Sequence, residues 1–191
     1  MTNPLSNTKS QESVAYHEAG HVVVASVLNF GIEDREKTLT ICESGQGISH
    51  YQPTLVPGDE CASTRKRIIA LYAGLIAQRR FFPTCLDKYA QGDNEEIRDL
   101  VGNLYGGPDT AKAKHLLAET HRECGELVDL HFRAIKALAS EVWKKPWKDT
   151  VVATPPCMQT REKWLGAKEI VEILKEFELP VNLCKAKLIR D

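Results

Sequence analysis

The chain has 191 residues, of which 42% are hydrophobic and 27% are charged, and this composition is sufficient for one ordinary globular core. Its 25 Lys and Arg residues are balanced by 26 Asp and Glu residues, giving a formal net charge of -1. This balance argues against a nucleic-acid binder, which needs a basic excess to meet phosphates, and against a polybasic membrane patch.

No targeting or membrane segment is expected. Residues 1–11 are polar and lack the apolar stretch of a secretory signal. No apolar run approaches the roughly 20 residues that span a bilayer. We therefore expect a soluble, cytoplasmic protein. Its six scattered cysteines form no C-x-x-C pair, so they indicate free thiols rather than a zinc finger or ribbon.

Apolar periodicity predicts a mainly α (α+β) fold. The chain order is a helix over about 11–28, two strands over 38–42 and 47–51, and helices over about 58–82, 92–105, 109–143 and 167–177. The turn residues between the two strands indicate a hairpin or two adjacent strands, and we expect one small β-sheet. We predict a domain over residues 1–145. Residues 146–191 are expected to form a connector and a C-terminal helix that pack on the same domain.

The first predicted helix contains the motif H-E-x-x-H, formed by His17, Glu18 and His21 with Ala19 and Gly20 between them. Residues four apart lie on one helical face, so both imidazoles can bind one metal ion, and zinc prefers such nitrogen ligands. Glu18 is then placed to act as the general base on a metal-activated water. The competing interpretation is a solvated helix with surface histidines. The apolar residues on both sides of the motif disfavour it, because buried polar groups need partners.

Gly20 lies inside this helix and lowers its intrinsic stability by about 1 kcal/mol relative to alanine. We expect another element, or substrate, to approach the helix closely there.

The segment from Ser13 to Ala25 resembles the active-site helix of the FtsH-like zinc peptidases, the proteolytic domains of membrane-bound AAA+ proteases. Further similarity, over roughly residues 17–138, includes a following strand (38–41), a substrate-facing edge strand (47–51), and a helix (71–78) that keeps one glycine of the family's Gly-Gly-Arg-x-Ala-Glu-Glu pattern but not its acidic residues. The resemblance implies a helical zincin-like peptidase domain. Because the first helix starts near residue 1, we expect a stand-alone relative without the ATPase domain.

The resemblance also implies a third zinc ligand, an aspartate that opens a later helix. Asp93 fits, since Ile97 follows four residues later, and Glu96 fits a rival register. Asp93 is preferred because it keeps the residue type, although an aspartate at this place is also suited to capping the helix.

The expected function is therefore ATP-independent hydrolysis of peptide bonds by a zinc metalloendopeptidase, acting on flexible peptides or unfolded protein. Zn²⁺ is expected to be held by His17, His21 and Asp93. His50 on the edge strand is a minor candidate for stabilising an oxyanion, and more commonly such a histidine is a half-exposed strand residue. Two alternatives stay open: a catalytically weak metal-binding interaction or regulatory module, and a structural domain without metal. The sequence does not indicate an oligomeric state.

Overall fold

The computed structural model describes residues 4–53, 58–85, 90–151 and 159–185. Its helical part is built around one central helix, α1 (Pro4–Val27), which packs against α2 and α4. Every residue from Ser13 to Ser26 is buried, so this part of the helix is enclosed on all sides. The remaining helices are α2 (Glu60–Phe81), α3 (Gln91–Tyr105), α4 (Ala111–Lys144) and α5 (Ala167–Glu176).

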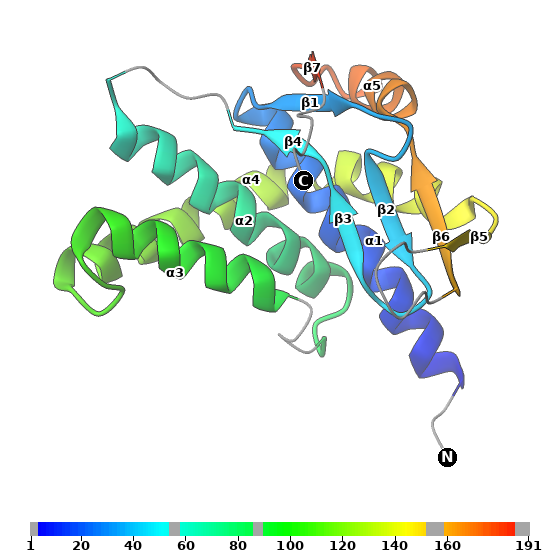
Figure 1. Cartoon of the computed structure of the whole chain (residues 1–191), viewed down its shortest axis with the longest axis horizontal. Coiled ribbons are helices and arrows are strands. Elements are labelled where there is room, and N and C mark those ends of the chain that lie inside the picture. The colour runs from blue at the N-terminus through cyan, green and yellow to red at the C-terminus, as the bar shows by residue number, and fades with distance from the viewer. Residues whose placement is uncertain (1–3, 54–57, 86–89, 152–158, 186–191) are drawn as a thin grey trace.

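Two small sheets lie on the other side of α1 (Figure 1). The four-stranded sheet has the order β3-β2-β6-β5, and the three-stranded sheet has the order β4-β1-β7. Strand β3 therefore forms an edge of its sheet, next to α1. The bounds are β1 (Gly31–Asp34), β2 (Leu39–Cys42), β3 (Gly47–Ser49), β4 (Tyr51–Gln52), β5 (Lys148–Val151), β6 (Gln159–Leu165) and β7 (Asn182–Lys185).

The mainly helical α+β fold is confirmed, and so is the hairpin, because β2 and β3 pair in antiparallel fashion. The prediction of one sheet was wrong. The region 146–191, which was expected to form a connector and one helix, also contributes β5, β6 and β7. These strands are short and rich in charged or polar residues, which local propensity disfavours. They form because β6 pairs with β2 and β7 pairs in parallel with β1, and these are contacts between distant parts of the chain.

The C-terminal segment packs on the same core as the first helices. Leu165 of β6 and Ile170 and Leu174 of α5 are fully buried in the main hydrophobic cluster, together with Val22 and Ile135 of the central helices. The division at residue 145 stays a prediction, since it concerns folding units rather than contacts. In the part of the chain that the structure describes, we find no helix that combines the length and apolarity needed to cross a bilayer.

Candidate metal centre

Three ligand atoms from two helices meet beside α1. Nε2 of His17 lies 3.0 Å from Nε2 of His21, and the two nitrogens lie 3.0 and 3.3 Å from Oδ2 of Asp93. His17 and His21 are one turn apart on α1, and Asp93 comes from the first turn of α3. Both imidazoles are about 4% exposed. The structure thus brings together the three residues that the sequence singled out as metal ligands.

The outer nitrogen of each imidazole is held by the neighbouring helix α2. Nδ1 of His21 lies 2.7 Å from the backbone carbonyl oxygen of Ala70, which accepts its hydrogen bond. Nδ1 of His17 lies 3.2 Å from Oε1 of Gln78, and the Gln78 amide in turn donates to Oγ of Ser13 at 2.9 Å. Since both carbonyl oxygens only accept, each imidazole carries a proton on Nδ1. Both Nε2 atoms are then left to act as ligands.

A missing side chain on α2 makes room for the two imidazoles. A Cβ on Gly74 would lie 2.4 Å from Nε2 of His21 and 2.6 Å from Nε2 of His17. Gly20 has the same role on the opposite helix, where a Cβ would lie 2.6 Å from the carbonyl oxygen of Ala73. The predicted close approach at Gly20 is therefore confirmed, and the approaching element is α2.

The charges of the centre favour a cation. Burial alone would raise the pKa of Asp93, but hydrogen bonds from His17 and His21 and their charge hold it well below its ordinary value. Burial would lower the pKa of His21, yet the hydrogen bond and charge of Asp93, with a contribution from Glu18, raise it to about 9. In the metal-free protein, the lone pairs of the two Nε2 atoms face the carboxylate of Asp93. A proton bound on His21 stabilises this arrangement.

Glu18 lies beside this centre, under the edge strand. Its side chain is buried, at 5% exposure, and within the described residues its carboxylate makes no hydrogen bond or ion pair. A Cβ on Gly47 of β3 would lie 2.5 Å from Oε1 of Glu18, so a larger residue at that point of the strand would displace the Glu18 side chain. An unpaired carboxylate at this depth is unusual for a structural residue and suits a group that exchanges protons.

A cavity of about 410 Å³ opens over the metal centre and is bounded by α1, α2, α3 and the strands β3 and β4. Its lining consists of His17, Glu18, His21, Gly47, Ile48, Ser49, Tyr51, Pro53, Arg67, Leu71, Gly92, Asp93 and Glu96. A second cavity of about 200 Å³ shares His17, Glu18, Gly47 and Gly92, and continues past Glu18 towards Gly45 and Gln91. Open space therefore lies on both sides of Glu18, along the edge strand.

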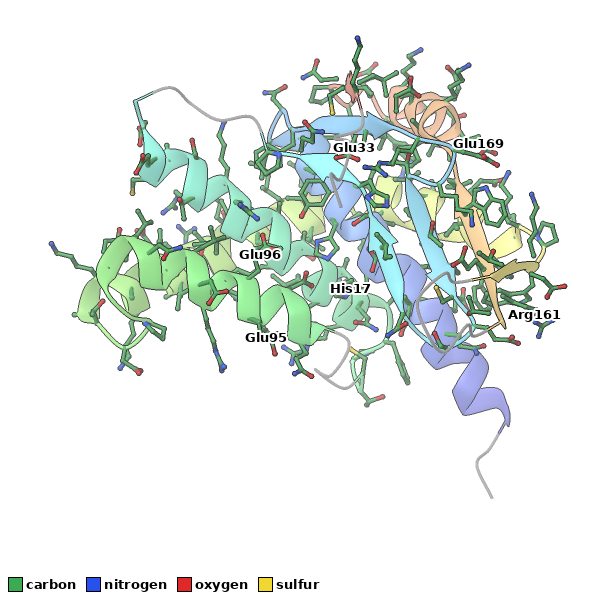
Figure 2. The ribbon with its side chains drawn as sticks, in the orientation of Figure 1. His17, Glu33, Glu95, Glu96, Arg161 and Glu169 are labelled. Carbon is green, nitrogen blue, oxygen red and sulfur yellow. The ribbon has the colours of Figure 1, made fainter. Side chains whose placement is uncertain are left out.

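Asp93 and Glu96, the rival candidates for the third ligand, have different environments. Oε1 of Glu96 accepts hydrogen bonds from Arg67 of α2 at 2.6 Å, whereas Asp93 contacts both imidazoles. Glu96 lies on the side of α3 that faces α2, and Glu95 lies on the opposite side (Figure 2). The N-cap of α3 is Ala90, with no side-chain cap, so Asp93 does not cap this helix.

His50 lies apart from the centre. It is absent from the cavity lining, and its pKa is lowered by burial and by the neighbouring Arg35, against the opposing charge of Glu33. Its neighbours Ile48, Ser49 and Tyr51 border the cavity, and His50 does not. The minor prediction of an oxyanion role for His50 is therefore not supported by its position.

The residues present fit zinc. Bonds of about 2.0–2.1 Å in a tetrahedral set would separate the ligand atoms by roughly 3.3 Å, close to the distances observed here. Two imidazoles, each with its outer nitrogen hydrogen-bonded, plus one carboxylate form a donor set typical of catalytic zinc sites. Within the described residues, His17, His21 and Asp93 are a group of potential ligands whose donor atoms all lie within 4.8 Å of one another.

The chain resembles part of a zinc protease. It is 29% identical over 107 residues to the ATP-dependent zinc metalloprotease FtsH of Heterosigma akashiwo (strain NIES-293 / 8280G21-1), a match that covers 52% of this chain. The chain spans about 15% of the length of that relative. No family model matches. This partial similarity indicates a relationship to the FtsH metalloproteases, and the whole relative's ATP-dependent activity is not transferred by it.

The sequence did not identify the roles of Gln78 and Gly74 at this centre. A glutamine and a glycine within an apolar helix are both signals that a helix face meets something polar or close. These signals identify contacts with His17 and His21 only once α2 is known to pack on α1.

Proposed function

We propose that the chain is a zinc-dependent endopeptidase that hydrolyses peptide bonds without nucleotide. One observation carries the proposal: a buried, unpaired Glu18 adjoins three convergent metal-ligand atoms and faces a cavity beside an open strand edge. In this proposal His17, His21 and Asp93 hold the ion. Glu96 is left to its ion pair with Arg67.

Zinc, when bound, would supply Lewis acidity that brings the pKa of a water near 7 and polarises a carbonyl. The chain supplies the proton transfers. Glu18 accepts a proton from the attacking water and passes it to the amine that leaves. The absence of any partner for its carboxylate among the described residues keeps both oxygens available for this exchange.

The open edge of β3 supports an extended peptide as substrate. The amide of His50 donates to Thr38, and Gln46 accepts from Cys42, so the even-numbered residues of this segment bond inward to β2. By alternation, the backbone groups of Gly47 and Ser49 point away from β2, where a peptide could add as a further strand. Space on both sides of Glu18 favours cleavage inside a chain over removal of a terminal residue.

The alternative is a metal-binding module without useful catalysis. It is motivated by the 71–78 segment, which lacks the acidic residues found in FtsH-like peptidases. The geometry favours the enzyme, because Gln78 in this segment holds His17 as a carboxylate would, and Gly74 leaves room for both imidazoles.

The substitution Glu18→Gln tests the proposal, with casein and a fluorogenic peptide library as substrates. We expect the wild-type protein, loaded with zinc, to cleave internal peptide bonds and the variant to lose at least about 10²-fold in kcat. Zinc content, measured by elemental analysis, should be equal in both proteins. Glu43→Gln, which changes a half-exposed glutamate of the β2–β3 turn that pairs with Arg161, is the control and should keep full activity. Equal inertness of all three proteins with bound zinc would favour the binding module.

A further inference from the structure

We propose that Tyr51 is a catalytic residue whose hydroxyl donates a hydrogen bond to the carbonyl oxygen of the peptide bond being cleaved. This inference rests on the proposed peptidase function. It adds a group that neither the H-E-x-x-H motif nor the similarity to FtsH assigns.

Tyr51 is held rigidly at the border of the metal cavity. It begins β4, where it pairs with Ile32 of β1. Its ring stacks near Phe30, with centroids 6.1 Å apart and an interplanar angle of 17°. The centroid of the His21 ring lies 6.3 Å from that of Tyr51. A phenol in contact with both a core phenylalanine and a metal-binding imidazole has little freedom to turn away from the centre.

Tyr51 also lies on the side of the strand segment that a bound peptide would face. Gly47, Ile48 and Ser49 of β3 border the same cavity as Tyr51. Gly47 lies against Glu18, and the backbone of Gly47 and Ser49 offers a strand edge that no other described strand pairs with. A peptide that adds to this edge would therefore pass Glu18 and Tyr51 in one binding mode.

The hydroxyl of Tyr51 is available and protonated. None of the described residues makes a hydrogen bond to it, and among them no fully buried side-chain oxygen lacks a partner, so this oxygen keeps access to the cavity. A phenol has an ordinary pKa of about 10, so this hydroxyl is protonated at neutral pH and can donate a hydrogen bond.

The chemistry calls for such a donor. Attack on a peptide carbonyl moves negative charge onto its oxygen, and a fixed neutral donor in a partly dry site stabilises that charge. Arg67 also borders the cavity, but it is bound to Glu96 and lies seven residues from Gly74 along α2, or about 10 Å. Ser49 is the remaining side-chain hydroxyl in the lining, and its flexible hydroxyl is less fixed than a stacked phenol.

The decisive variant is Tyr51→Phe, which keeps both ring contacts and removes only the hydroxyl. We expect kcat on a fluorogenic peptide to fall about 10²-fold with KM little changed. A phosphinic pseudopeptide, which mimics the tetrahedral state and needs no turnover, should bind more weakly by a similar factor in calorimetry. Zinc content and Tm should match those of the wild type. Tyr72→Phe, which changes a ring beside His121 outside the cavity lining, is the matched control and should change none of these.

Equal affinity of Tyr51→Phe and Tyr72→Phe for the phosphinic peptide would overturn the inference, as would a loss of zinc or of Tm in Tyr51→Phe. A full effect in Ser49→Ala, with Tyr51→Phe unaffected, would assign the role to Ser49 instead. Failure of the peptidase proposal has a different signature. The zinc-loaded wild type would then cleave no peptide, whereas the calorimetric comparison of Tyr51→Phe with the wild type would still test the hydrogen bond.

Discussion

Replacing Gln78 should weaken the metal centre without touching a ligand. Gln78 has no exposed surface and bridges Ser13 on α1 to Nδ1 of His17. In Gln78→Leu the N–H of His17 loses its acceptor in a buried place. Leaving such a donor unsatisfied costs about 1–3 kcal/mol, so the free energy of unfolding should fall by that amount. The imidazole also loses the contact that fixes its tautomer and orientation.

The effect on zinc should be larger than a general loss of stability explains. Removing a hydrogen-bond partner of a ligating histidine commonly lowers metal affinity by about 10- to 100-fold, or roughly 1.4–2.7 kcal/mol. We expect this loss for Gln78→Leu in a zinc titration against a chromophoric chelator. Gln78→Glu should do the opposite to zinc, because a carboxylate accepts more strongly from His17. The metal-free Gln78→Glu protein should be less stable than the wild type, since a charge is then buried.

The control is Gln52→Leu, which removes a glutamine that bonds Glu33 and the backbone of Lys185 in the other sheet. It should lower stability slightly and leave the zinc affinity unchanged. If Gln78→Leu and wild type bind zinc equally, the contact to His17 does not orient a ligand, and the argument from outer hydrogen bonds fails.

Three further outcomes are expected. Asp93→Asn should lose bound zinc in elemental analysis while Glu96→Gln keeps it, because only Asp93 contacts both imidazoles; the reverse pattern would exchange their roles. Gly74→Ala should also lose zinc, since its Cβ would overlap both imidazoles, whereas Gly102→Ala, where a Cβ meets nothing within 4 Å, should keep it. Without zinc, the urea midpoint should fall as pH rises from about 6.5 to 9. Burial lowers the pKa of His21, but the hydrogen bond and charge of Asp93 outweigh burial and raise this pKa to about 9 in the folded protein. The stability that protonated His21 contributes is therefore complete below the pKa of the unfolded protein, about 6.5, and is lost as the pH rises through the folded pKa. Asp93→Asn should flatten this decline.

The features that could be predicted from the sequence, the helices and the H-E-x-x-H motif, depend on residues that are close together in the chain. The H-E-x-x-H motif needs only one helix to align His17 and His21, and the helix periods were strong enough to place all five helices. The third ligand required a longer inference, because Asp93 lies 76 residues from His17 and was reached through resemblance rather than spacing.

The features that the sequence missed are created by tertiary packing. Strand β7 is a short exposed segment near the C-terminus, and it becomes a strand only because Gly31–Asp34 offers a parallel partner some 150 residues earlier. Gly31–Asp34 contains a glycine and two acidic residues, so local propensity is poor there as well. Pairings at such separation carry no local signal, and the second sheet was therefore absent from the prediction.

The 71–78 segment lacks the acidic residues of the FtsH-like pattern, and this difference motivated the alternative of a binding module without catalysis. The structure shows what a residue at this place has to do, which is to accept a hydrogen from Nδ1 of His17 inside the core. An amide oxygen meets that need and adds a donor for Ser13. Under the proposed function, the uncharged amide would leave one negative charge fewer beside a bound ion, so zinc would be held less tightly than with a carboxylate. Gln78 is therefore compatible with the proposed metal centre.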